Sequence, residues 1–155
     1  MKNIVIEKLN SRNLTVSVAE SMTGGLLAAT ITSVPGASKV FKEGIITYSN
    51  TSKVKYLKVK LETLTQFSEY SKEVAYEMAK GIKELTKSDI GVSITGVAGP
   101  DGGTDDIPIG TVFIGVAREV VKVYHFTFVG DRNKIRQSAC QKALEMINEE
   151  LKDDI

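Results

Sequence analysis

The chain has 155 residues, of which 42% are hydrophobic and 25% charged, with a formal net charge of +1. A chain of this size forms one domain with a substantial core, and a nearly neutral charge excludes the strongly basic surface of bulk nucleic-acid binders. A lone Cys140 excludes an internal disulfide, and a lone His125 excludes a three-histidine zinc site. We therefore expect a single cytoplasmic domain over residues 1–155 that binds no nucleic acid, membrane or metal.

Hydrophobic spacing predicts alternating helices and strands. Apolar residues three and four positions apart indicate helices, and short β-branched runs indicate strands. In chain order, the predicted elements are a helix over 1–12, a strand over 14–20, a helix over 24–33, a strand over 43–50, a short helix from about residue 51, a helix over 71–86, strands over 89–95, 109–118 and 120–129, and a helix after residue 131. Ser71 and Asp131 are the expected N-caps of the two long helices.

The order of these elements predicts an α/β fold, a single-domain three-layer α/β/α arrangement with a mixed, partly antiparallel sheet. The last two strands are expected to form an antiparallel hairpin. Candidate core residues are Ile4, Leu9, Val74, Met78, Ile82, Leu85, Ile135, Ala139, Leu144, Ile147 and Leu151. Cys140 is interpreted as a small core side chain and His125 as a structural residue of its strand.

Three unusual segments directly follow predicted strands, where α/β sheets bind ligands. The first is "ESMTGG", in which Ser21 and Thr23 precede Gly24 and Gly25 at the start of a helix. Free N–H groups at a helix start favour a bound anion or the oxyanion of an acyl-transfer reaction. The alternative is a tight turn in which Ser21 or Thr23 only caps the helix.

The second segment is "TYSNTSK", in which Tyr48 and Ser49 end a strand and Lys53 lies in the first turn of the next helix. The helix dipole disfavours a positive charge there, which helps to keep the amine neutral. A neutral lysine is what a general base requires. The alternative is an ordinary surface lysine beside Lys55 and Lys58.

The third segment is "TGVAGPDGG", in which Thr95 ends a strand and Gly96 and Gly99 follow. Its glycines allow a close approach of the backbone to an anion. The aspartates near it lack the spacing of a calcium loop and are interpreted as turn formers.

A fourth candidate is "DRNKIR", in which Arg132 and Arg136 share one helix face. Two guanidinium groups so placed could bind a phosphate. The alternative is a pair of solvated surface arginines.

Five segments together resemble the CinA carboxy-terminal domain family: "AESMTGG", "VPGAS", "GIITYSN", "TGVAGPDGGT" and "IGTVFIGVA". The resemblance runs from about Leu14 to the last helix. It implies an amidase that converts nicotinamide mononucleotide to nicotinic acid mononucleotide and ammonia, without metal or cofactor, in a homo-oligomer (a dimer or larger). The alternative is a nucleotide-binding regulatory module linked to competence or DNA damage, with no turnover.

The resemblance also implies roles for individual residues. Ser21 would be the nucleophile and Lys53 the base, with Tyr48 and Thr95 assisting in the site. The expected substrate-binding residues are Thr23, Gly24, Gly25, Ser49, Gly96, Gly99, Arg132 and Arg136. N–H groups around the two neighbouring glycines would hold the oxyanion, and one arginine or both would hold the 5′-phosphate.

Two departures from the family pattern stand close to these residues. Met22 replaces a common cysteine after the serine, and Ser68, Glu69, Tyr70 and Ser71 stand where relatives usually read "GAVS". We expect the second departure to reshape the rim of the site or an oligomer contact.

Overall fold

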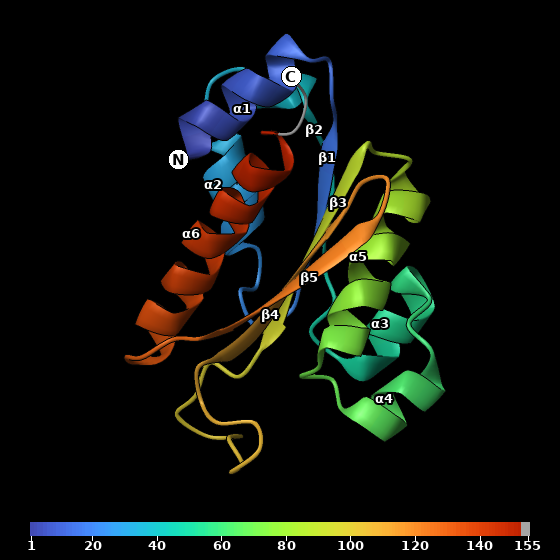
Figure 1. Ribbon diagram of the computed structural model, residues 1–155, viewed down its shortest axis with the longest axis vertical. Helices are drawn as coiled ribbons and strands as arrows, with labels where there is room; N and C mark the ends of the chain where they lie inside the picture. Colours follow the sequence, from blue (N-terminus) through green and yellow to red (C-terminus); the bar gives the residue numbers. More distant parts are fainter. Residues whose placement is uncertain (153–155) are drawn as a thin grey trace.

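The computed structural model describes residues 1–152, whose helices and strands alternate as the hydrophobic pattern predicts (Figure 1). The elements are α1 (Lys2–Ser11), β1 (Val16–Glu20), α2 (Leu26–Thr32), a 3₁₀ turn (Ala37–Lys39), β2 (Phe41–Ile46), α3 (Asn50–Leu57), α4 (Leu61–Phe67), α5 (Lys72–Thr86), β3 (Ile90–Gly96), β4 (Thr111–Ala117), β5 (Val121–Thr127) and α6 (Arg132–Glu150).

The strands form one mixed sheet in the order β2-β1-β3-β4-β5. β1 is parallel to both β2 and β3, whereas β4 is antiparallel to β3 and β5. Glu20 pairs with Ile46 on one side and with Ile94 on the other. The three parallel strands therefore end nearly level, and the segments that follow them begin at one edge of the sheet.

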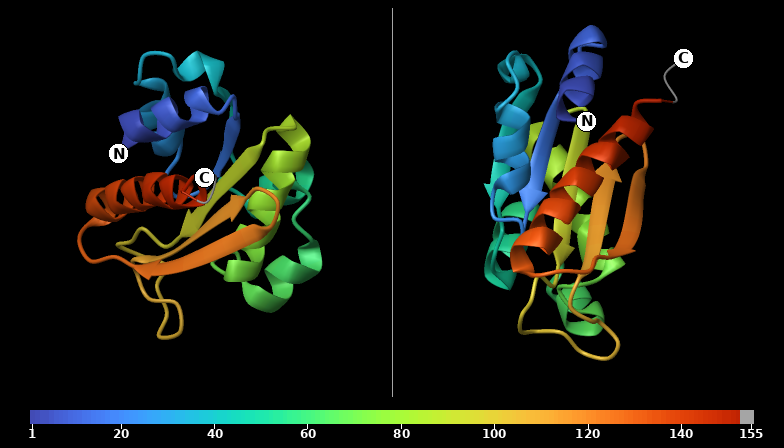
Figure 2. Two further views of the ribbon diagram at one scale, coloured as in Figure 1. Left: turned by 45° about the horizontal axis from the view of Figure 1, so that its top comes forward. Right: turned by 90° about the vertical axis from the view of Figure 1, so that its left-hand side faces the viewer.

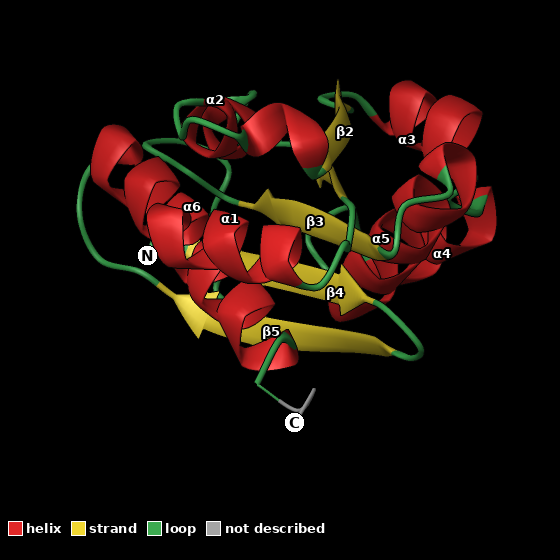
Figure 3. Cartoon of the chain, turned by 90° about the horizontal axis from the view of Figure 1, so that it is seen from above, coloured by secondary structure: helices red, strands yellow, loops and turns green. Residues whose placement is uncertain are grey.

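Helices cover both faces of the sheet, which confirms the predicted three-layer α/β/α fold. α1, α2 and α6 lie on one face, and α3, α4 and α5 lie on the other (Figures 1 and 3). β1 and β3 are buried along their whole length, as expected for strands covered on both sides. An apolar cluster fills each of the two layers between helices and sheet.

Most predicted elements are confirmed, including the β4–β5 hairpin and the capping roles of Ser71 and Asp131, whose side chains accept N–H bonds of α5 and α6. The prediction missed α4 and extended β2 too far, because the chain leaves the sheet after Ile46 to begin α3. Ile4 and Leu85 are half exposed rather than core residues. Leu85 lies in the last turn of α5, where the chain turns away toward β3, and the buried face of α1 is centred elsewhere on that helix.

The start of α6 and the loop between β3 and β4 lie at the same end of the molecule as the carboxyl ends of the parallel strands (Figure 2). Three connections and one helix start therefore meet there. Within residues 1–152, no helix has both the length and the apolar character needed to cross a bilayer.

Candidate active site

Ser21 lies directly after β1 and is held by backbone hydrogen bonds on both sides. Its N–H donates to the carbonyl of Ile94 at 3.0 Å, and its own carbonyl accepts the N–H of Gly24 at 3.0 Å. The residue is 7% exposed. The hydroxyl is thus fixed at the edge of the sheet and still reachable from one side.

Lys53 reaches the same point from α3. Ser49 caps this helix in a reciprocal pair with Ser52, which sets the helix start and the position of Lys53 in its first turn. The side chain of Lys53 is 2% exposed. Its Nζ lies 3.2 Å from the Oγ of Ser21 and donates to the carbonyl of Thr47 at 2.8 Å.

Burial lowers the pKa of Lys53 below its ordinary value of 10.5, and the negative charge of Glu69 partly opposes this effect. Desolvation disfavours the ammonium form because a buried charge loses its hydration. A neutral amine can donate one N–H to the carbonyl of Thr47 and keep its lone pair for the O–H of Ser21. The geometry therefore suits proton transfer from the serine to the lysine.

The two side chains open into a cavity of about 130 Å³. Its lining comes from the ends of the three parallel strands, α3, the α4–α5 connection and the start of α6. The lining residues are Ser21, Met22, Tyr48, Lys53, Glu69, Tyr70, Gly96, Val97, Ala98, Gly99, Asp101 and Arg132. The volume is below the ~300–1,000 Å³ of typical ligand sites, so the cavity suits one end of a ligand whose remainder lies outside.

Arg132 and Tyr48 form one rim of this cavity. The guanidinium of Arg132 donates to the carbonyl of Gly99 at 2.7 Å and to the hydroxyl of Tyr48 at 3.0 Å. Tyr48 is 61% exposed. An arginine carries five N–H groups, so this one retains donors for an anion that reaches the rim.

Six of the predicted site residues do not line the cavity: Thr23, Gly24, Gly25, Ser49, Thr95 and Arg136. Arg136 instead donates from Nε to the carbonyl of Met22 and from Nη2 to that of Thr23, both at 3.0 Å. Thr95 is fully buried and donates its hydroxyl to the carbonyl of Glu69 at 2.9 Å. These two side chains hold backbone next to the cavity.

Backbone N–H groups at the start of α2 already have hydrogen-bond partners within the protein. The carboxylate of Glu20 accepts the N–H groups of Leu27 and Ala28 at 2.9 and 3.0 Å, and the N–H of Gly24 is bonded to the carbonyl of Ser21. This arrangement leaves these three groups no role in binding an oxyanion. Neither Gly24 nor Gly25 lines the cavity, so the backbone N–H groups that face it belong to other segments.

Glu69 and Tyr70 line the cavity; their segment was expected to reshape the rim of the site or an oligomer contact, but neither residue was named as a site residue. Both belong to the segment that departs from the family pattern, which is the only signal in the sequence that marks them. Burial, with Glu69 beside it, raises the pKa of Tyr70 to about 12. Tyr70 therefore stays protonated at neutral pH and does not compete with Lys53 as a base.

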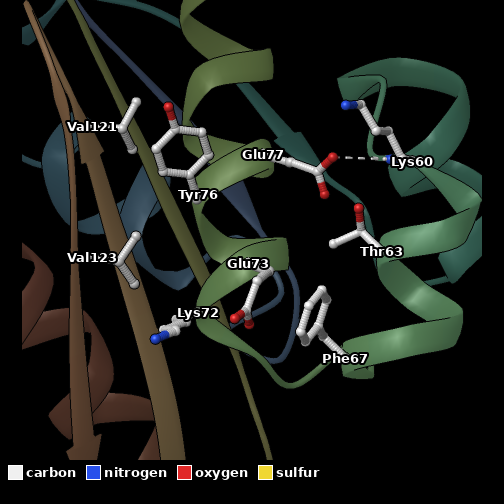
Figure 4. A pocket seen from close by; sticks show the side chains of 9 residues that line it. All are labelled: Lys60, Thr63, Phe67, Lys72, Glu73, Tyr76, Glu77, Val121 and Val123. Atoms are coloured by element: carbon white, nitrogen blue, oxygen red, sulfur yellow. Dashed lines mark hydrogen bonds between the residues drawn. The ribbon is translucent and has the colours of Figure 1, made fainter.

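A second cavity, of about 520 Å³, lies between α4, α5 and β5 (Figure 4). Phe67, Tyr76, Val121 and Val123 form its apolar walls, and Glu77 accepts the backbone N–H of Lys60 at 3.4 Å. No nucleophile with an adjacent base is present among its lining residues, so its size does not make it the better candidate. Among residues 1–152, no group of three or more His, Cys, Asp or Glu side chains is arranged to hold a metal ion.

Comparison with known proteins adds the family context. The profile described as the CinA C-terminal domain matches residues 1–151. A putative competence-damage inducible protein of Clostridium novyi is 46% identical over 97% of the chain, and a CinA-like protein of Kosmotoga olearia is 49% identical over 97%. The chain spans about 37% of the length of each of these relatives.

Two solved structures share the whole fold. The competence/damage inducible protein CihA of Agrobacterium tumefaciens has a TM-score of 0.91 at 35% identity, covering 96% of this chain and 92% of that one. A CinA superfamily protein of Klebsiella pneumoniae has a TM-score of 0.93 at 33% identity, covering 97% and 94%.

Proposed function

Because the chain belongs to the CinA C-terminal domain family, we propose that it hydrolyses the carboxamide of nicotinamide mononucleotide to give nicotinic acid mononucleotide and ammonia. The observation that carries this proposal is the buried amine of Lys53 at 3.2 Å from the hydroxyl of Ser21. An activated serine next to a neutral base is the arrangement that acyl transfer requires. The only histidine, His125, is exposed on β5 and stacks on Phe113, so it supplies no competing base.

In the first half of the reaction, the Oγ of Ser21 attacks the carboxamide carbon while the Nζ of Lys53 accepts the hydroxyl proton. The carbonyl oxygen becomes an oxyanion. The C–N bond then breaks, and the ammonium of Lys53 returns its proton to the departing nitrogen, which leaves as ammonia. The products of this half are an ester on Ser21 and a neutral Lys53.

In the second half, water attacks the ester while Lys53 accepts one of its protons. The tetrahedral intermediate then expels the Oγ of Ser21, which takes that proton back. Carboxylic acid is released and the starting state of both residues is restored. The whole cycle needs one proton acceptor, and Lys53 fills this role in both halves.

The lining of the cavity supports further roles. Backbone N–H groups of Ala98, Gly99 and Met22 are the proposed oxyanion donors, because these residues line the cavity beside Ser21. The N–H of Val97 is already bonded to the carbonyl of Thr111 at 2.9 Å. Loss of such a donor typically raises the barrier by about 3 kcal/mol. Arg132, at the rim, is the proposed partner of the 5′-phosphate, which would lie outside the small cavity.

The test is ammonia release by the purified chain incubated with nicotinamide mononucleotide, measured alongside the Ser21→Ala variant. Release by the wild type that the variant abolishes supports the proposal. Folded wild-type protein that binds the nucleotide and releases no ammonia would instead support a non-catalytic binding module.

A further inference from the structure

The connection between α4 and α5 is a fixed turn, and it carries the two cavity residues that depart from the family pattern. Ser68 adopts a φ of 75°, which is uncommon for a residue other than glycine. Its Oγ accepts the N–H of Tyr70 at 3.1 Å, and its carbonyl accepts the hydroxyl of Ser71 at 2.8 Å. Ser71 in turn caps α5. Hydrogen bonds within the protein therefore hold the backbone of this turn.

Glu69 lies in the middle of this turn and lines the cavity with Ser21 and Lys53. The hydroxyl of Thr95, at the end of β3, donates to its backbone carbonyl at 2.9 Å, which ties the turn to the sheet. Its charge is close enough to Lys53 to act on that amine. The carboxylate is thus directed toward the reacting end of the cavity.

No ion pair within residues 1–152 involves Glu69. The guanidinium at the rim is bonded to Gly99 and Tyr48 instead. The amine of Lys53, in the same cavity, is buried with its pKa lowered. The hydroxyl of Tyr70 is hydrogen-bonded to the carboxylate of Glu69 but is neutral. The negative charge of the partly buried carboxylate therefore has no cationic partner, which is unfavourable unless something compensates it. A positively charged ligand group in the cavity would supply that compensation.

We propose that Glu69 selects ligands whose ring carries a positive charge next to the carboxamide, that is, N1-substituted pyridinium carboxamides, over ligands of the same shape with an uncharged ring. This inference rests on the proposed function, because it assumes that the carboxamide lies against Ser21. The ring then lies in the cavity beside Glu69, and an ionic contact between carboxylate and pyridinium strengthens binding. The neutral ring of a dihydropyridine receives no such contribution.

The two oxidation states of nicotinamide mononucleotide provide matched probes. The reduced form keeps the carboxamide, the ribose and the phosphate but carries an uncharged ring. Binding of each form to the Ser21→Ala variant is measured by calorimetry, so that no turnover is required. We expect this variant to bind the oxidised form about tenfold more tightly than the reduced form, as expected for a partly buried charge pair.

Adding Glu69→Gln should remove most of this preference by weakening the oxidised form alone. Glu62→Gln is the matched control, because Glu62 is an exposed carboxylate in the first turn of α4 and outside the cavity. That control should leave the preference unchanged. Equal affinities for the two forms, an equal loss of both with Glu69→Gln, or no binding of either form would overturn the inference. A wild-type chain that releases no ammonia, while its Ser21→Ala variant keeps the preference, would refute only the proposed hydrolysis.

Discussion

The Nζ of Lys53 lies 3.2 Å from the Oγ of Ser21, although 32 positions separate the two residues in the chain. Ser21 follows the interior strand β1, and Lys53 lies in the helix that follows the edge strand β2 beside it. Parallel pairing of β1 and β2 brings both to one edge. The local sequence around Ser21 or Lys53 does not show that the two residues meet. The topology of the sheet brings them together.

This pair predicts that Ser21→Ala and Lys53→Met each abolish amide hydrolysis. Each substitution removes one partner of a single proton transfer, so each should lower kcat roughly 10³-fold or more. The double variant should be no worse than either single one, since the two residues act as a unit. Lys55→Met, on the same helix and exposed, should retain activity. Losses that add independently in the double variant would show that the two residues do not cooperate.

The lowered pKa of Lys53 predicts the pH dependence of activity. The base must be neutral, so kcat/KM should rise with pH as Lys53 loses its proton and level off above its pKa, which lies below 10.5. Glu69 opposes the lowering, so Glu69→Gln should move this acid limb to lower pH. The other titratable groups of the cavity are Tyr48, Tyr70, Asp101 and Arg132, and Tyr70, with a pKa of about 12, does not titrate in this range. If Glu69→Gln does not shift the acid limb, that limb reports the titration of a group other than Lys53.

The same pKa predicts how stability changes with pH. Between the pKa of Lys53 in the folded protein and 10.5, the unfolded chain binds a proton that the folded chain does not. The free energy of unfolding therefore rises with pH in this window, by at most about 1.4 kcal/mol per pH unit. Lys53→Met lacks this contribution. As pH rises, the free energy of unfolding of the wild type should therefore increase relative to that of the variant. Urea unfolding of both proteins at several pH values measures it, and parallel curves would contradict it.

The role of a site residue could be predicted from the sequence where it depends on residues nearby in the chain. Ser21 and Lys53 stand out because strand ends and helix starts are readable from hydrophobic spacing, and the structure brings both to one cavity. The capping role of Ser71 was also readable, since an N-cap acts on its own helix. Local patterns therefore predict most of the elements and the residues at their ends, although they missed α4.

Roles that depend on long-range contacts could not be read in this way. Arg136 shares a helix face with Arg132, yet its guanidinium bonds to the backbone of Met22 and Thr23 across the sheet edge. The same holds for Thr95, whose partner lies 26 positions earlier in the chain. Only the packing of α6 and of the α4–α5 connection against the strand ends decides these roles.

The different partners of the two arginines predict different kinetic effects. Arg132→Gln should raise KM for nicotinamide mononucleotide about 10- to 100-fold, because it removes charge-assisted bonds to the phosphate. The effect on the riboside, which lacks the phosphate, should be much smaller. If KM rises equally for both substrates, Arg132 does not bind the phosphate.

Arg136→Gln should instead lower kcat roughly tenfold with both substrates, because the backbone next to Ser21 loses its support and small misplacements of a nucleophile slow a reaction. The ratio of kcat/KM between mononucleotide and riboside should stay at its wild-type value. A selective rise in KM for the phosphorylated substrate would mean that this guanidinium leaves its backbone partners to bind the phosphate.

Glu20 predicts a stability effect at the same edge of the sheet. Its carboxylate is 1% exposed and accepts the N–H groups of Leu27 and Ala28. In Glu20→Gln, the amide nitrogen would face one of these donors and leave it unpaired, which should lower the free energy of unfolding by about 1–3 kcal/mol. Glu43→Gln, an exposed carboxylate on β2, is the control and should have little effect. Urea midpoints that agree among all three proteins would show that water or a backbone shift replaces the lost bond, and the start of α2 would then not depend on Glu20.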